Sequence, residues 1–150
     1  MTATTDRQFL HEAVASRTTG YSLPGIFYSD ERIYRAELDA IWRKGWLFAG
    51  HSCEIKSPGD YFTLNVDGDS LIIVRNDDGA AKALWNVCRH RGTELCDEGS
   101  GRVGRIVCPY HQWTFARDGR LLSCRGMQEQ IDKSELGLRE AELREVAGLL

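Results

Sequence analysis

Two short segments, each with one cysteine and one histidine, constrain the fold of this chain more than any other feature. The first runs from Cys88 to His90 and the second from Cys108 to His111, with seventeen residues between His90 and Cys108. Thiolate sulfur and imidazole nitrogen are strong ligands of transition metals. The pattern therefore predicts a metal centre held between two loops, and ligation is expected to contribute to the folding of both.

The ligand set fits a Rieske [2Fe–2S] cluster, in which two cysteines bind one iron and two histidines bind the other. The alternative is a structural Cys2His2 zinc module, because tetrahedral zinc accepts the same four ligands. Zinc-finger spacing usually pairs cysteine with cysteine and histidine with histidine, whereas each loop here carries one of each. The spacing therefore favours the cluster over zinc.

The two histidines also predict how such a cluster takes up an electron. Two ferric irons, two sulfides, two thiolates and two neutral imidazoles sum to zero charge, so reduction leaves −1. An all-cysteine cluster begins at −2, and adding an electron to it costs more. Histidine ligation therefore raises the potential, to roughly −150 to +300 mV against about −400 mV for plant-type ferredoxins.

Composition predicts a soluble domain of ordinary size. The 150 residues are 42% hydrophobic and 27% charged, and the net charge of −3 argues against a general nucleic-acid binder. No apolar run approaches the ~20 residues of a membrane span, and the first ten residues lack the apolar core of a secretory signal. We expect a cytoplasmic chain without a membrane partner, in which Cys53, Cys96 and Cys124 are free thiols.

The charge is unevenly distributed along the chain. The segment from Cys88 to Arg125 contains seven arginines and four acids, so it carries +3 and the remainder carries −6. Two interpretations stay open. The arginines either form an ordinary solvated surface, or form a collar that stabilises the reduced cluster and attracts an acidic redox partner.

The hydrophobic pattern from residue 46 onward predicts a mainly β fold. Short strands are expected at residues 61–66, 71–74, 81–87, 105–107, 113–115 and 121–122, and Asp-Gly pairs between several of them predict tight turns. Strands of this length favour small antiparallel sheets. We expect one domain over residues 46–150, with its cluster-binding part at about 86–125.

The first 45 residues are expected to precede this domain as a separate segment. Residues 1–20 show no sustained period, which predicts a flexible N-terminal arm. Residues 21–45 predict an extended stretch, broken by Pro24 and Gly25, and then one N-terminal helix from about 29 to 44. Ser29 or Asp30 can cap that helix.

The segments Cys88–Gly92 (CRHRG) and Cys108–Trp113 (CPYHQW) resemble the two cluster loops of Rieske proteins. From about Tyr21 to Leu150 the chain is similar to the N-terminal part of a Rieske non-haem iron oxygenase α subunit. The resemblance implies the Rieske iron–sulfur-protein (ISP-like) fold, with a cluster-binding subdomain. It implies Cys88, His90, Cys108 and His111 as the cluster ligands, with Arg91, Gly92, Tyr110 and Trp113 around them.

Departures from the high-potential respiratory members imply a low-potential centre. Those members bridge the loops with two further cysteines, which would fall at Thr93 and Tyr110 here. They also place hydroxyl donors to the cluster where this chain has Trp113 and Phe115. Without those donors the reduced, more negative cluster is less stabilised.

The oxygenase resemblance further implies a path for the electron. In that family a reductase or ferredoxin supplies electrons, and the Rieske domain passes them to a mononuclear Fe(II) held by two histidines and a carboxylate. The subunits commonly form homotrimers, and transfer to a neighbouring subunit would leave through His111. We expect that catalytic iron domain to be absent from these 150 residues, so that the chain alone transfers an electron and oxidises no substrate.

One position narrows the resemblance. Many ring-hydroxylating members have glycine after the second histidine, whereas this chain has Gln112. Together with Leu95 and Cys96, Gln112 is similar to the branch that hydroxylates or N-demethylates quaternary ammonium compounds such as glycine betaine, stachydrine, carnitine or choline. The remaining alternative is a stand-alone Rieske ferredoxin, although such carriers are usually shorter and lack a helix like that at residues 29–44.

Overall fold

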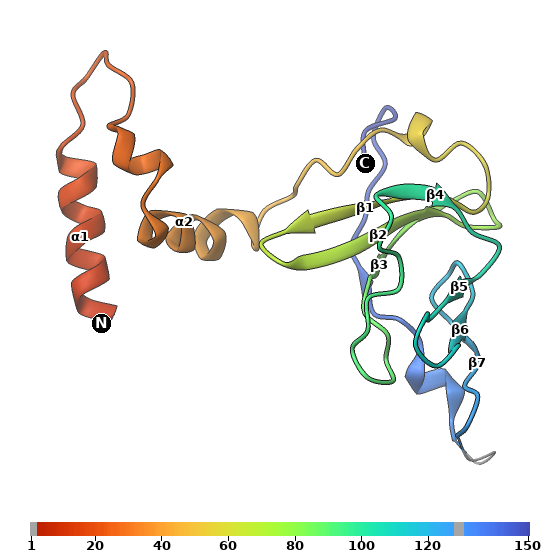
Figure 1. The fold of residues 1–150 in the computed structure, drawn as a ribbon. Coiled ribbons are helices and arrows are strands. Elements are labelled where there is room, and N and C mark those ends of the chain that lie inside the picture. The colour runs from red at the N-terminus through yellow and green to blue at the C-terminus, as the bar shows by residue number, and fades with distance from the viewer. Residues whose placement is uncertain (1–2, 128–130) are drawn as a thin grey trace. The chain divides into compact units, whose positions relative to one another are not determined.

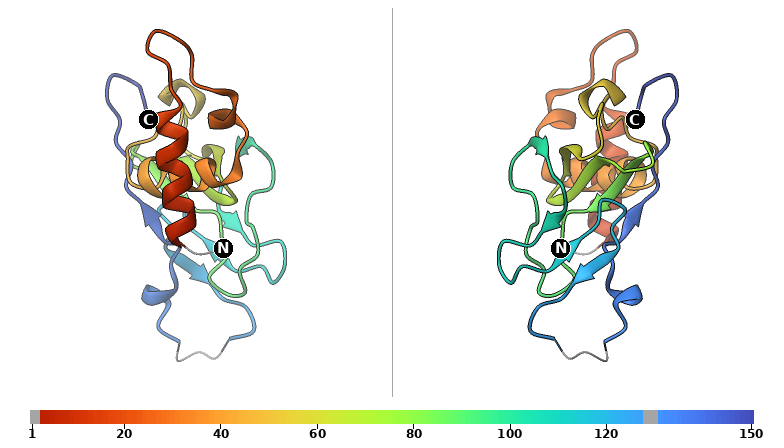
Figure 2. Two further views of the ribbon diagram at one scale, coloured as in Figure 1. Left: turned by 90° about the vertical axis from the view of Figure 1, so that its left-hand side faces the viewer. Right: turned by 90° about the vertical axis from the view of Figure 1, so that its right-hand side faces the viewer.

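The computed structural model describes residues 3–127 and 131–150, and the chain divides after Leu47 into two units. The N-terminal unit is helical and the unit from Phe48 to Leu150 is built from strands (Figures 1 and 2). No helix in the described ranges is long and apolar enough to cross a membrane.

The N-terminal unit contains more helix than the sequence predicts. Helix α1 spans Ala3–Ala15, where the sequence predicts an arm without regular structure. Phe9, Ala13 and their neighbours Leu10 and Val14 recur at helical spacing, and Ala13 is buried. The guanidinium of Arg32 lies 3.3 Å from the centre of the Phe9 ring, which ties α1 to the next helix.

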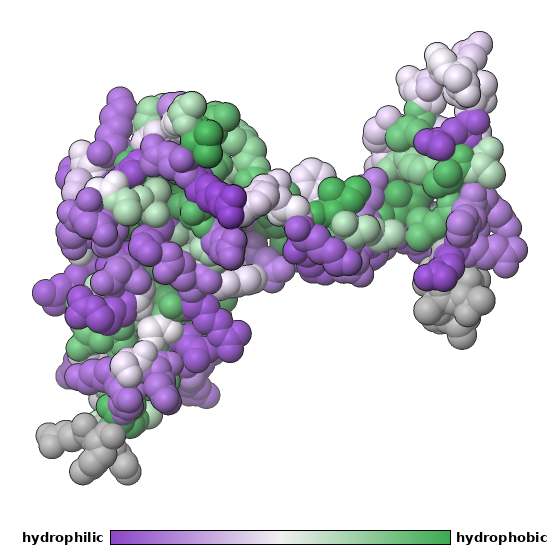
Figure 3. Space-filling model, turned by 180° about the vertical axis from the view of Figure 1, so that it is seen from behind, coloured by the Kyte–Doolittle hydropathy of each residue, from purple (hydrophilic) through white to green (hydrophobic). Residues whose placement is uncertain are grey.

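The helix predicted at about residues 29–44 is present in two parts. Helix α2 spans Glu31–Glu37, and the Asp30 side chain caps it by accepting a bond from the Arg32 N–H (2.9 Å). A single π-helical stretch, η2 (Leu38–Trp42), continues it, with the Arg43 N–H donating to the Leu38 carbonyl. The stretch expected to be extended instead forms a short 3₁₀ helix, η1 (Gly25–Tyr28), because Pro24 pre-sets a backbone angle that suits a first helical turn. Hydrophobic side chains gather on the face of this unit seen in Figure 3.

The second unit confirms the mainly β, antiparallel fold class. A five-stranded sheet has the order β4-β1-β2-β3-β8, and a three-stranded sheet has the order β5-β6-β7. The larger sheet comprises β1 (Asp60–Val66), β2 (Asp69–Arg75), β3 (Ala81–Trp85), β4 (Ser100–Arg102) and β8 (Glu140–Ala141). The smaller comprises β5 (Ile106–Val107), β6 (Thr114–Phe115) and β7 (Leu121–Ser123), and two 3₁₀ turns, η3 (Ser52–Glu54) and η4 (Lys133–Leu136), lie in the loops.

Turn chemistry sets the register of the first hairpin. Asp67 and Gly68 both have positive φ, 49° and 85°, as a two-residue type I′ turn requires. The turn pairs Val66 with Asp69 and places β1 against β2. Alternate residues of these strands therefore face opposite sides of the sheet.

Two hydrophobic clusters cover the two faces of the larger sheet. One face presents Tyr61, Ile72 and Leu84 to a core that also holds both loop cysteines, Trp113 and Phe115. The other face presents Phe62, Ile73 and Ala83 to Ile55 and the chain's last residue, Leu150. The two loops with cysteine–histidine pairs therefore pack against the core of the β unit.

Candidate metal centre

The two loops that carry the cysteine–histidine pairs close with the same backbone bonds. In the first, the Cys88 N–H donates to the Thr93 carbonyl (2.8 Å) and the Gly92 N–H to the Cys88 carbonyl (3.0 Å). In the second, the Cys108 N–H donates to the Trp113 carbonyl and the Gln112 N–H to the Cys108 carbonyl, at the same two distances. Each cysteine is therefore fixed at the mouth of a tight five-residue turn.

Gln112 occupies the place in the second turn that Gly92 occupies in the first. Both residues have left-handed backbone angles, with φ of 60° for Gln112 and 75° for Gly92. A residue with a side chain pays roughly 1 kcal/mol or more to adopt this conformation. In return the Gln112 side chain accepts a bond from Arg125 (3.2 Å).

The two thiols lie together in the core. Cys88 and Cys108 are 2% and 1% exposed, and both belong to the same buried hydrophobic cluster. Burial raises the pKa of Cys88 and the neighbouring Cys108 adds to the rise, whereas the N–H groups of His90 and Arg91, which point at the sulfur, lower it. Those N–H groups are placed to stabilise a thiolate once a metal replaces the proton.

The two imidazoles form a second pair. The rings of His90 and His111 meet edge to face with centroids 4.8 Å apart. The Nδ1 atom of each is buried and has no hydrogen-bond partner in the described part of the chain, so both nitrogens are available to bind a metal. Desolvation, followed by the charges of His90 and Arg91, lowers the pKa of His111. This favours the neutral imidazole that metal binding needs.

Sulfur paired with sulfur and nitrogen paired with nitrogen is the arrangement that a cluster of two irons requires. Among the residues that the structure describes, no three His, Cys, Asp or Glu side chains group around a single ion. A zinc module would need all four ligands to converge in a tetrahedron. The donor set therefore fits a [2Fe–2S] cluster and does not favour the zinc alternative.

Aromatic rings enclose the histidine pair on two sides. Trp113 is 2% exposed and stacks on His90 with centroids 4.8 Å apart and planes 10° from parallel. The ring centroids of Tyr110 and His111 are 3.7 Å apart, and Tyr110 is 58% exposed. The Arg91 guanidinium lies 5.8 Å from the centre of the Tyr110 ring. Trp113 therefore excludes water from the site, whereas Tyr110 and Arg91 face outward from it.

Asn86 is a supporting residue that the sequence interpretation missed. It is fully buried, and its Oδ1 accepts from the N–H groups of Leu95 and Cys96 (3.1 and 2.8 Å). Its Nδ2 donates to the side chains of Ser70 and Glu94 and to the Cys96 carbonyl. Asparagine is disfavoured in strands. Its position directly after β3 and two residues before Cys88 is the sequence feature that could have indicated a structural role.

The three cysteines outside the pairs are all free thiols, as the sequence predicts. Cys96 is buried against Tyr61, and burial raises its pKa to about 11. Cys53 is exposed, and Cys124 is partly buried beside the core. None of the three adds a second sulfur pair to the site.

These features define a cluster-binding domain of two antiparallel sheets, and comparison with known proteins assigns its family. The Rieske [2Fe–2S] domain matches residues 45–139, which is more than half of the chain. The chain belongs to this family.

Several proteins that this chain resembles are oxygenases or their subunits. The chain is 41% identical over 140 residues to the glycine betaine monooxygenase oxygenase subunit of Chromohalobacter salexigens, covering 93% of this chain and 32% of that protein. The crystal structure of the quaternary ammonium Rieske monooxygenase CntA with L-carnitine matches with a TM-score of 0.75 and 38% identity over 84% of this chain and 36% of CntA. Naphthalene 1,2-dioxygenase from Rhodococcus sp. matches with a TM-score of 0.83 and 29% identity over 95% and 34%. The chain thus spans about a third of the length of the relatives it matches.

Proposed function

We propose that Cys88 and Cys108 bind one iron of a Rieske [2Fe–2S] cluster and that His90 and His111 bind the other through Nδ1. The observation that carries this proposal is the pairing of two buried thiols beside two imidazoles whose Nδ1 atoms are buried without partners. When bound, such a cluster accepts and releases one electron.

The residues of the chain have separable roles in this proposal. Nδ1 ligation leaves the proton of each neutral imidazole on Nε2, where it can donate a hydrogen bond to an acceptor outside the loop. Trp113 holds the His90 ring in plane and keeps water away. We assign His111, beside the exposed Tyr110, as the exit for the electron.

The domain would serve as the electron-transfer part of an oxygenase α subunit. Electrons would come from a reductase or ferredoxin and pass through His111 to a mononuclear Fe(II) in a catalytic domain outside these 150 residues, with the full-length protein a homotrimer. The names of the relatives support this role. A reducing cytoplasm would keep the three free cysteines as thiols.

For the substrate we propose a quaternary ammonium compound, which would be hydroxylated or N-demethylated with O₂. Gln112 after the second histidine and the similarity to glycine betaine and carnitine enzymes support this class. The test is turnover by the full-length protein with a reductase, on glycine betaine, carnitine and naphthalene in parallel. Turnover of naphthalene alone would refute the substrate class.

The ligand assignment is tested by single substitutions in the cluster-loaded chain. Cys88→Ser, Cys108→Ser and His90→Ala should each lower bound iron and sulfide from about two of each per chain to near zero. Cys53→Ser is the matched control, because Cys53 is exposed and outside the loops. Full cluster content in Cys108→Ser would overturn the assignment.

A further inference from the structure

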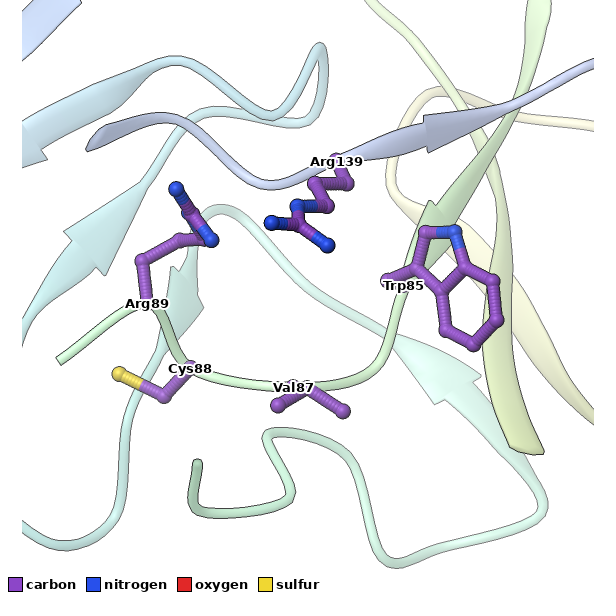
Figure 4. Close-up of a pocket in the computed structure, with 5 residues that line it drawn as sticks. All are labelled: Trp85, Val87, Cys88, Arg89 and Arg139. Carbon is purple, nitrogen blue, oxygen red and sulfur yellow. The ribbon is translucent and has the colours of Figure 1, made fainter. Parts of the chain in front are cut away.

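A pocket of about 240 Å³ opens on the surface directly beside the first cysteine ligand. Trp85, Val87, Cys88, Arg89 and Arg139 line it. Figure 4 shows the guanidinium groups of Arg89 and Arg139 on the same side of the backbone that runs from Trp85 to Arg89, with the Trp85 ring at the other end of that segment. The walls come from the end of β3, the first cluster loop and the segment before β8.

The two arginines bring positive charge to the pocket without a matching acid. Within the described ranges, no hydrogen bond or ion pair joins the side chain of Arg89 or Arg139 to another group. The nearest acidic neighbour in sequence, Glu140, is already bonded to Lys82 at 2.7 Å. Two guanidiniums beside an apolar ring match a carboxylate, which binds them through parallel hydrogen bonds.

Apolar side chains around the loops extend this site into a surface. Val87 and Val107, each directly before a ligand cysteine, are 42% and 47% exposed, and Tyr110 is exposed beside the second loop. The stretch of chain from Cys88 to Arg125, which carries both loops, has more arginines than acids. Exposed apolar groups with arginine nearby are the composition of a protein-binding surface rather than of a small-molecule site.

We propose that this pocket receives an Asp or Glu side chain of an acidic electron-donor protein, and that Arg89 and Arg139 position the donor at the Cys88 side of the cluster. The inference rests on the proposed function. One electron would pass from the reduced donor to the oxidised cluster, so the donor would lose one electron and the cluster would gain one. Entry beside Cys88 and exit at His111 place the two transfers at different ligands.

The test uses a plant-type [2Fe–2S] ferredoxin of net negative charge as the donor, since its potential lies below that of histidine-ligated clusters. Stopped-flow absorbance follows reduction of the cluster-loaded chain, and calorimetry gives the Kd of the oxidised ferredoxin, both at low ionic strength. The double variant R89Q/R139Q should lower the second-order rate constant and raise Kd by about tenfold or more, with a smaller dependence of rate on salt.

The control double variant is K56Q/R102Q, which removes the same charge. Arg102 is in β4, at the opposite edge of the sheet from β8, and Lys56 precedes β1. Its rate constant and Kd should stay within about twofold of the parent chain. Reduction by methyl viologen radical, a small cation, should also be unchanged in R89Q/R139Q.

Parent-like binding and reduction of R89Q/R139Q by ferredoxin would overturn the inference. An equal loss in K56Q/R102Q would also overturn it, because net charge and not the pocket would then steer the donor. A parent chain that methyl viologen radical cannot reduce would overturn the proposed function, and this inference with it.

Discussion

Replacing Asn86 with alanine should strongly destabilise the first cysteine–histidine loop. Asn86 is fully buried and makes five hydrogen bonds, three of them to the backbone of Leu95 and Cys96. Alanine keeps the β-unit core but leaves two N–H groups and one carbonyl without a partner. Those groups hold residues 94–96 against the start of the first loop.

The size of the effect follows from these groups. A buried backbone group that loses its partner costs about 1–3 kcal/mol, less where water can enter the space left by the side chain. Three such groups give an expected loss of roughly 3–4 kcal/mol in the free energy of unfolding. That is a large part of the ~5–15 kcal/mol available to a domain.

Urea unfolding followed by Trp fluorescence would measure this loss, and hydrogen exchange would locate it. We expect faster exchange over residues 86–96 in Asn86→Ala and little change over β1 and β2. Asn65→Ala is the control, since Asn65 is exposed in β1 and should change stability by less than about 0.5 kcal/mol. Equal stability of the two variants would refute the role assigned to Asn86.

Three further substitutions test other parts of the account. Gln112→Gly should raise the free energy of unfolding by about 0.5 kcal/mol, and Gln112→Val should lower it by more than about 1 kcal/mol. The reason is that only glycine adopts the left-handed backbone angle of this position freely. Urea titrations in which the valine variant is the more stable would contradict this. Trp113→Ala should cost about 3–5 kcal/mol through loss of a fully packed ring, whereas Trp113→Phe should keep most of the stability, as thermal unfolding would show. Burial raises the pKa of Cys96 from 9.0 to about 11, so the unfolded thiol loses its proton at lower pH than the folded one. The free energy of unfolding should therefore fall between pH 9 and 11 by up to about 2–3 kcal/mol. The same dependence of stability on pH in the parent chain and in Cys96→Ala would exclude the effect.

The candidate ligands could be proposed from the sequence because cysteine and histidine bind metals through their own chemistry, whatever the surrounding fold. Two thiols and two imidazoles at this spacing fit few metal sites, so their pairing was predictable. Hairpins were predictable where turn chemistry is explicit, as at Asp67 and Gly68. In both cases a local pattern was sufficient evidence.

Features that depend on tertiary contacts were missed. Strands β4 (Ser-Gly-Arg) and β8 (Glu-Ala) have no strand propensity, and they are extended because β1 and β3 offer open edges. Helix α1 was missed because most of its residues are polar and show no clear hydrophobic period. Its contact with the next helix, between Phe9 and Arg32, depends on the tertiary structure. Asn86 is important because its five hydrogen bonds reach four residues between Ser70 and Cys96, which no local pattern encodes.

The central claim is that the chain holds two irons in unlike environments, one bound by thiolates and one by imidazoles. Mössbauer spectroscopy of the ⁵⁷Fe-loaded, dithionite-reduced chain tests it directly. The account predicts two iron sites of equal population, with the added electron on the histidine-bound iron, since neutral ligands offset less of its positive charge. Two irons in like, all-sulfur environments, or a chain that binds zinc in place of iron and sulfide, would contradict it.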